Sequence, residues 1–119
     1  MAYTGVAGNQ VPVQACTTNG TTQATALAGA NSQINLLSQA VSVNSTGAGG
    51  AVVLPFSAPG YTIDLLQITG GNTCNVFPNV GESINAIAVN SAITMAALTR
   101  ATFICVTQGT WLTNPLLPS

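Results

Sequence analysis

The sequence predicts an all-β protein, a single antiparallel β-sandwich or barrel-like domain, and three observations carry this prediction. From residue 44 onward, turn signals rich in glycine, proline and asparagine recur about every eight to twelve residues. The segments between them are short and rich in β-branched or alternating apolar residues, without the length of a convincing helix. The 119 residues leave room for one core but not for two.

Most of the expected extended segments are followed within two or three residues by a proline, glycine or asparagine, and Thr99-Arg100 separates 92–98 from 101–106. The segments are 51–54, 61–68, 74–77, 83–84, 86–89, 92–98, 101–106 and 110–112. Segment 101–106 is apolar on both faces, which predicts a central strand. The glycine clusters at 47–50 and 70–71 are expected to be hairpin turns. No internal repeat of fixed period is visible, so a solenoid or propeller is not expected.

Three parts of the chain differ in composition. Residues 1–19 are expected to be an extended N-terminal arm, in which Val11 and Val13 alternate with Pro12 and Gln14. Residues 20–112 form the β domain, and residues 113–119 form a tail that contains two prolines. The arm buries little by itself, so it is either mobile or fixed by a neighbouring subunit.

The stretch 21–43 supports two interpretations. The apolar residues Leu27, Ala30, Ile34, Leu37 and Val41 have helical spacing. However, a glycine and two small polar residues interrupt the middle of this pattern, and no clear capping box precedes it. Its second half also shows period-two alternation, which is typical of a strand, but periodicity alone favours a helix.

Charged side chains are nearly absent. The chain contains one basic residue, Arg100, two acidic residues, Asp64 and Glu82, and neither lysine nor histidine. Binding to a nucleic acid or to an anionic membrane needs several basic residues, so neither partner is expected. A mean hydropathy of +0.47 argues against a disordered chain. Because a surface without charge promotes association, an ordered subunit of a larger assembly is expected.

The residue types needed for catalysis are also missing. Without histidine or lysine, the usual bases that activate a nucleophile are absent. Asp64 is expected to be solvated or paired with Arg100, and Glu82 to be exposed in a turn. With two carboxylates and no histidine, the chain is not expected to be an enzyme or to bind a cofactor or metal.

Cysteine usage is typical of a reducing compartment. Cys16, Cys74 and Cys105 are odd in number and far apart, without a Cys-x-x-Cys spacing. Cys74 and Cys105 lie in apolar runs and are expected to be buried, whereas the polar surroundings of Cys16 are compatible with exposure. The first residues do not form a secretory signal, and no apolar run is long enough to span a membrane.

A series of short motifs resembles a known group of proteins. The motifs are GTTQATAL (20–27), VLP (53–55), APG (58–60), NVFP (75–78), GESIN (81–85), ATFIC (101–105) and GTW (109–111). In this order they resemble a small β-rich module of tailed-bacteriophage virion proteins, found in capsid decoration (cement) proteins and in head or tail fibres. The resemblance covers about residues 20–112 and implies that 33–43 is a strand.

The resemblance implies a structural role without catalysis. Such proteins form homotrimers on the outer capsid surface, where they bind the major capsid protein and hold neighbouring capsomers together; this chain would be made in the host cytoplasm. The expected subunit or capsid contacts are Val11, Val13, Trp111, Leu112, Leu116 and Leu117. The alternative is a head- or tail-fibre or spike module that binds a host receptor or glycan, which an exposed aromatic cluster would favour.

Overall fold

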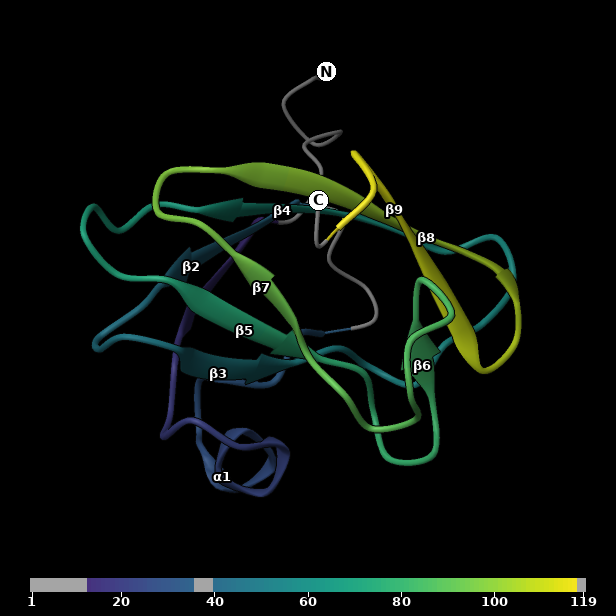
Figure 1. Ribbon diagram of the computed structural model, residues 1–119, viewed down its shortest axis with the longest axis horizontal. Coiled ribbons are helices and arrows are strands. Elements are labelled where there is room, and N and C mark those ends of the chain that lie inside the picture. Colours follow the sequence, from purple (N-terminus) through teal and green to yellow (C-terminus); the bar gives the residue numbers. More distant parts are fainter. Residues whose placement is uncertain (1–12, 36–39, 118–119) are drawn as a thin grey trace, which may run out of the picture.

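The computed structural model describes residues 13–35 and 40–117, which form nine β-strands and one short helix (Figure 1). In chain order these are β1 (Val13–Thr17), α1 (Gln23–Ala28), β2 (Ala40–Asn44), β3 (Gly50–Val53), β4 (Thr62–Gln67), β5 (Cys74–Phe77), β6 (Ser83–Ile84), β7 (Ile93–Met95), β8 (Arg100–Thr107) and β9 (Thr110–Asn114). The prediction of a β-rich chain is confirmed.

The strands form two sheets, which we call sheet A and sheet B. Sheet A contains six strands in the order β1-β2-β4-β8-β9-β6, and sheet B contains three in the order β3-β5-β7. The pairs β1–β2, β2–β4, β3–β5 and β6–β9 are parallel. The prediction of an antiparallel domain is therefore wrong, because both sheets are mixed.

Successive turns of the chain stack on one another like the coils of a solenoid. Strands β2 and β3 form one coil, and β4 and β5 form the next. Ala40 pairs with Asp64 and Gly50 with Cys74, so both strands of this coil recur after 24 residues. An earlier coil contains β1 and Gln33, which forms a parallel bridge to β3. The fold is thus not a β-sandwich, and the expectation that it would not resemble a solenoid is wrong.

The turns at the corners explain why the antiparallel prediction failed. The glycine clusters at 47–50 and 70–71 do not close hairpins; each carries the chain from sheet A to sheet B, so the next strand joins a different sheet. At one corner, Gly50 lies so close to Thr18 that an added Cβ would overlap the threonine hydroxyl. Turn residues predict that the chain changes direction, but they do not predict which sheet the next strand joins.

Uncharged polar side chains hydrogen-bond one coil to the next at these corners. The Ser45 hydroxyl donates to the carbonyl of Thr73 at 2.8 Å, and the Asn72 amide donates to the carbonyl of Ser45 at 2.9 Å. The Thr46 N–H donates to the Thr18 hydroxyl at 3.0 Å. Part of the Ser, Thr and Asn content is therefore structural, because these side chains satisfy backbone groups where the ladders are interrupted.

Antiparallel strands end the stack of coils. Strand β7 pairs antiparallel with β5 in sheet B, and β8 pairs antiparallel with β4 in sheet A. Strand β9 then pairs with β8, and β6 adds an edge to sheet A. With β4 on one side and β9 on the other, β8 is the central strand that the sequence predicted at 101–106.

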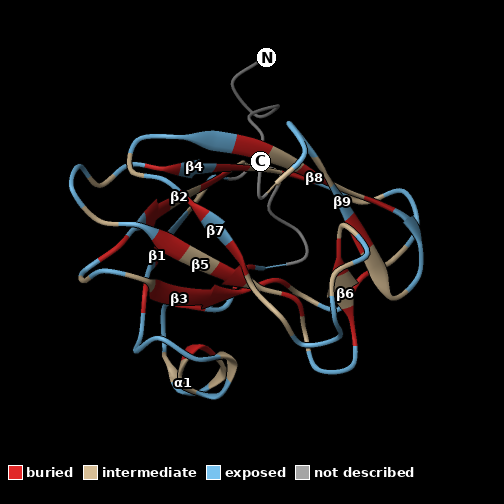
Figure 2. Ribbon diagram, in the orientation of Figure 1, coloured by how far each residue is buried: buried red, intermediate tan, exposed pale blue. Residues whose placement is uncertain are grey.

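The ambiguous stretch 21–43 contains a helix that the strand prediction missed. Helix α1 begins with a capping box, in which Thr22 and Thr25 each accept a hydrogen bond from the other's backbone N–H. It covers the outer side of sheet B, where Ala26 packs against Ala51 and Val53. Strand β3 is consequently buried along its whole length (Figure 2). The strand prediction is confirmed for 40–43 and wrong for 23–28, and residues 36–39 lie outside the described residues.

The main core lies between the two sheets. Its buried apolar side chains are Cys16, Ile34, Val41, Val43, Val52, Leu54, Ile63, Leu65, Cys74, Val76, Ile84, Ile93, Met95, Ala101, Phe103, Cys105 and Trp111. They come from all nine strands and the connecting segments, so both sheets bury one complete face against each other.

The folded unit extends beyond the expected domain limits at both ends. Strand β1 and the buried Thr18 belong to the fold, although the expected arm included residues 13–19. Strand β9 continues to Asn114, and Leu117 packs against the core, although the expected tail began at 113. Residues 1–12 of the expected arm lie outside the described residues.

Candidate interaction surface

The three charged residues occupy two very different environments. Arg100 Nη2 lies 3.5 Å from Asp64 Oδ2 on the solvent-facing side of sheet A, where these side chains are 69% and 44% exposed. Glu82, by contrast, is buried. The pairing of Asp64 with Arg100 is confirmed, and the expected exposure of Glu82 is wrong.

Glu82 joins three segments of the chain through hydrogen bonds. Its carboxylate accepts from the Ser57 N–H at 3.0 Å and from the Ser57 hydroxyl at 3.0 Å. The same hydroxyl accepts from the Gly109 N–H at 2.6 Å. A buried carboxylate is tolerated when such donors surround it, and here they hold the segment before β4 and the β8–β9 turn around β6.

The three cysteines are buried free thiols. Burial of Cys74 and Cys105 is confirmed, but Cys16 is also buried, because its strand is part of sheet A. Burial raises the pKa of the Cys16 thiol to about 11. Burial, together with the nearby Cys16, raises the pKa of the Cys74 thiol to about 12. Both remain protonated at neutral pH, in the form that neither attacks electrophiles nor binds metals well. In residues 13–35 and 40–117 no group of three or more acidic, Cys or His residues is placed to hold a metal ion.

The structure separates the six residues that were expected to make contacts. Val13, Leu112 and Leu116 are exposed, whereas Leu117 is half-buried against the core. Trp111 is fully buried at 0% exposure, so the prediction that it contacts a partner is wrong: its β9 position faces sheet B. Val11 lies outside the described residues.

Two of the exposed contact residues lie on one surface, which we call the outer face. This is the side of sheet A turned away from sheet B, formed by alternate residues of β1, β2, β4, β8 and β9. Its side chains are those of Val13, Ala15, Thr17, Ala40, Ser42, Asn44, Thr62, Asp64, Leu66, Arg100, Thr102, Ile104, Leu112 and Asn114, so apolar and polar residues are mixed on it. The sequence analysis missed this surface as a unit, although the alternation at 61–66 indicated one exposed side of that strand.

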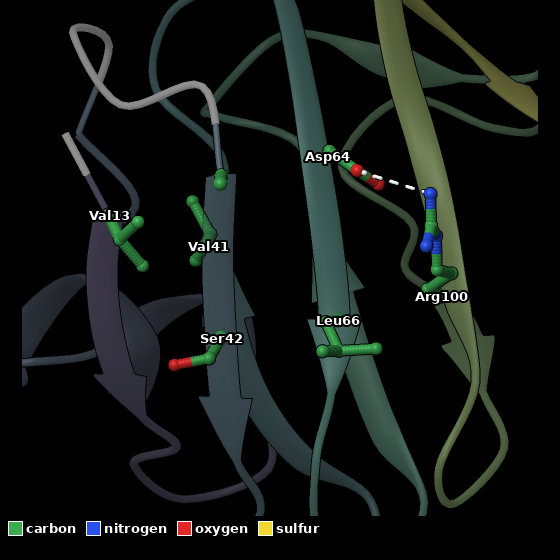
Figure 3. Close-up of a pocket in the computed structure, with 7 residues that line it drawn as sticks. Val13, Val41, Ser42, Asp64, Leu66 and Arg100 are labelled. Carbon is green, nitrogen blue, oxygen red and sulfur yellow. Dashed lines mark ion pairs between the residues drawn. The ribbon is translucent and has the colours of Figure 1, made fainter. Parts of the chain in front are cut away.

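A shallow pocket of about 150 Å³ lies on the outer face (Figure 3). Its walls are mainly apolar, with Val13 and Ala40 on one side and Leu66, Asp64 and Arg100 on the other. The Asp64 Oδ1 atom is shielded from solvent and accepts no hydrogen bond within the described part of the chain. A buried polar atom without a partner carries a free-energy cost that an external donor would remove.

A larger hollow of about 560 Å³ lies between the β7–β8 connection and the segment that follows β9. Thr94, Thr99 and Leu117 contribute to its walls. The Thr94 hydroxyl donates to Asn75 and the Thr99 hydroxyl donates to the Ala96 carbonyl, so both donors are already used. Arg100 lines this hollow as well as the pocket on the outer face.

Exposed aromatic side chains do not gather at one place within the described residues. Phe56 is largely exposed, Tyr61 and Phe77 are half-buried, and Phe103 and Trp111 belong to the core. A glycan-binding platform of stacked rings therefore has no counterpart in this part of the chain.

Comparisons with known proteins give no relative: no protein-family model and no curated protein matches this chain. Within the described segments, no helix has the length and hydropathy required to cross a lipid bilayer.

Proposed function

We propose that this chain is a structural virion protein of a tailed bacteriophage, a capsid decoration or cement protein. In this role it binds the outer surface of the phage head and stabilises contacts between capsomers. The observation that carries the proposal is a folded chain with few charged side chains and a sheet face whose exposed apolar side chains the described residues leave uncovered. Apart from the Asp64–Arg100 pair and the internal Glu82, it has no charged side chain for chemistry.

The partners in this proposal are the major capsid protein and further copies of the chain, which form a homotrimer. Nucleic acid and membrane are not partners, and the chain is not an enzyme. It is made in the host cytoplasm and resides on the outside of the virion head. A closed trimer buries apolar surface while limiting further association.

Adhesion to the shell would depend on apolar contacts and uncharged hydrogen bonds. Strand β1 is an edge of sheet A, and Leu116 is exposed near the end of the chain. The segments that adjoin these two places would pair with an edge of the shell protein. Because few charges take part, binding should depend only weakly on salt concentration.

A fibre or spike module that binds a host receptor or glycan is the second candidate, and we favour it less. Such recognition commonly uses clustered aromatic rings on the surface. Phe56 stands alone as a largely exposed ring within the described residues. A glycan array probed with the purified chain would detect such binding.

Co-sedimentation with empty phage heads that lack this chain tests the proposal. We expect saturable binding and heads that withstand higher temperature once they are covered. Leu116→Glu should lower the occupancy of the heads, whereas Val89→Glu, a matched change of an exposed residue in the β6–β7 loop, should not. Absence of saturable binding by the unmodified chain would contradict a cement function.

Removal of residues 1–12 tests the contribution of the N-terminal segment separately, because this truncation leaves β1 in place. Lower occupancy of the heads is expected, and unchanged occupancy would exclude this segment as a capsid contact.

A further inference from the structure

The outer face combines apolar side chains with the exposed ion pair. Leu66 and Arg100 are neighbours across β4 and β8, and Ile104 lies beside Leu112 across β8 and β9. Leu66 and Leu112 are 43% and 45% exposed, which is high for leucines on a sheet surface in contact with water. Asp64, Arg100 and Thr102 lie between these two exposed apolar places, so the face combines apolar and polar groups, as surfaces that bind another protein commonly do.

Asp64 and Arg100 satisfy each other incompletely within one chain. The Nη2–Oδ2 distance of 3.5 Å is long for a charge-assisted hydrogen bond. The second carboxylate oxygen of Asp64 accepts no bond among the described residues, and the Arg100 guanidinium carries five donors. Both groups therefore retain bonding capacity that a partner surface can use.

The partner must be apolar and must present one cation and one anion close together. The outer face itself meets this requirement. Because Glu82 is buried in an internal network, Asp64 and Arg100 are the charged side chains that the chain presents at its surface. A net charge of −1 also means that approaching copies repel each other little. A second copy is therefore the partner whose charges complement this face.

We propose that copies of this chain bind one another through the outer face of sheet A, with Asp64 of one copy paired to Arg100 of the next. In a closed ring each copy supplies one acid and one base, so every charge is paired whether the ring has two or three members. Affinity comes from the apolar side chains, and the ion pairs fix the register. The count of three belongs to the proposed function; the interface itself does not depend on capsid binding.

The pocket beside Asp64 supports this arrangement. The pocket has a volume of about 150 Å³, is open to solvent and has mainly apolar walls. A leucine or isoleucine side chain of a neighbouring copy can therefore enter it. Seating such a side chain beside Val13 and Leu66 would cover apolar area that one copy leaves in water.

Charge reversal tests the proposal. In Asp64→Arg, two arginines face each other across each contact, and in Arg100→Asp two aspartates do. Each variant alone should self-associate at least about tenfold more weakly than the unmodified chain, measured by sedimentation equilibrium. When the two are mixed in equal amounts, the introduced arginine of one variant meets the introduced aspartate of the other, so native mass spectrometry should detect mixed oligomers; in a ring of three, one of the three contacts still joins like charges, so mixed dimers should exceed mixed trimers. The double variant D64R/R100D should regain assembly.

Two controls keep the result interpretable. Leu112→Glu, on the outer face, should weaken self-association, whereas Val89→Glu, on the β6–β7 loop, should leave it unchanged. Circular dichroism spectra and melting curves of all variants establish that each remains folded. Unchanged self-association in both charge variants, or absence of mixed oligomers on mixing, would overturn the interface. Measuring head occupancy separately distinguishes this failure from failure of the capsid-binding proposal.

Discussion

The two sides of sheet A are built from alternate residues of the same strands, yet they differ in what covers them. On β4, Leu65 is fully buried against sheet B, whereas its neighbour Leu66 is 43% exposed on the outer face. The inner side is largely apolar and meets sheet B, whereas the outer side mixes apolar and polar side chains and is not covered by the described residues. The comparison indicates that the inner side determines the stability of the fold, and that the outer side serves association.

The largest difference in the free energy of unfolding is expected between alanine substitutions at Leu65 and at Leu66. Leu65→Ala removes a fully buried side chain and should lower the free energy of unfolding by about 2–5 kcal/mol. Leu66→Ala should change it by less than about 1 kcal/mol but should weaken self-association. Urea unfolding at low protein concentration measures the first effect, and sedimentation measures the second. Equal losses of stability would contradict the assignment of the two sides.

The second-largest effect is expected at alkaline pH, which should lower the free energy of unfolding because two cysteines buried in the core, Cys16 and Cys74, ionise more readily in the unfolded chain. The pKa values of the Cys16 and Cys74 thiols are raised from 9.0 to about 11 and about 12 in the folded chain. Above pH 9 the unfolded chain loses protons that the folded chain retains, so stability falls as the pH rises from about 9 towards 12. The slope for each ionising thiol is on the order of 1 kcal/mol per pH unit.

Urea unfolding between pH 7 and pH 11 measures this slope. The variant C16A/C74A serves as the control, because its slope above pH 9 should be shallower even though its stability at pH 7 is lower. The same slope in both proteins would show that these thiols are not the cause.

Substitution of the two acidic residues, buried Glu82 and partly exposed Asp64, is expected to change the free energy of unfolding by smaller amounts. Glu82→Ala leaves the Ser57 N–H and hydroxyl without their acceptor and should cost about 1–3 kcal/mol. Asp64→Asn disrupts an exposed ion pair and should cost less than about 1 kcal/mol in stability. Thermal unfolding of both variants tests this order, and a larger loss for Asp64→Asn would reverse the roles given to the two acids.

The sequence predicted the strands better than their arrangement. Alternating segments such as 61–66 indicate a strand wherever it pairs, so the β-rich class and the central position of β8 followed from local pattern. The sequence did not predict the parallel stacking of the strands, because the glycine turns that join β2 to β3 and β4 to β5 resemble those of hairpins. The 24-residue repeat is hidden because equivalent inward positions carry unlike residues: Val43 in one coil corresponds to Gln67 in the next.

Helix α1 and the candidate surface were missed for different physical reasons. A six-residue helix is too short to show periodicity, and its capping box uses Thr25 where a glutamate or glutamine is the usual signal. The outer face joins residues from 13 to 112 that meet only through strand pairing. The burial of Glu82 depends on donors 25 residues earlier in the chain, at Ser57, which no local pattern reveals.

The molar mass of the unmodified chain as a function of concentration tests most directly whether the outer face binds another copy. Light scattering on the eluting protein should give a multiple of 11.9 kDa at micromolar concentration, with dissociation on dilution. A constant mass of 11.9 kDa up to millimolar concentration would contradict the account, because the exposed apolar face would then be stable in water without a partner.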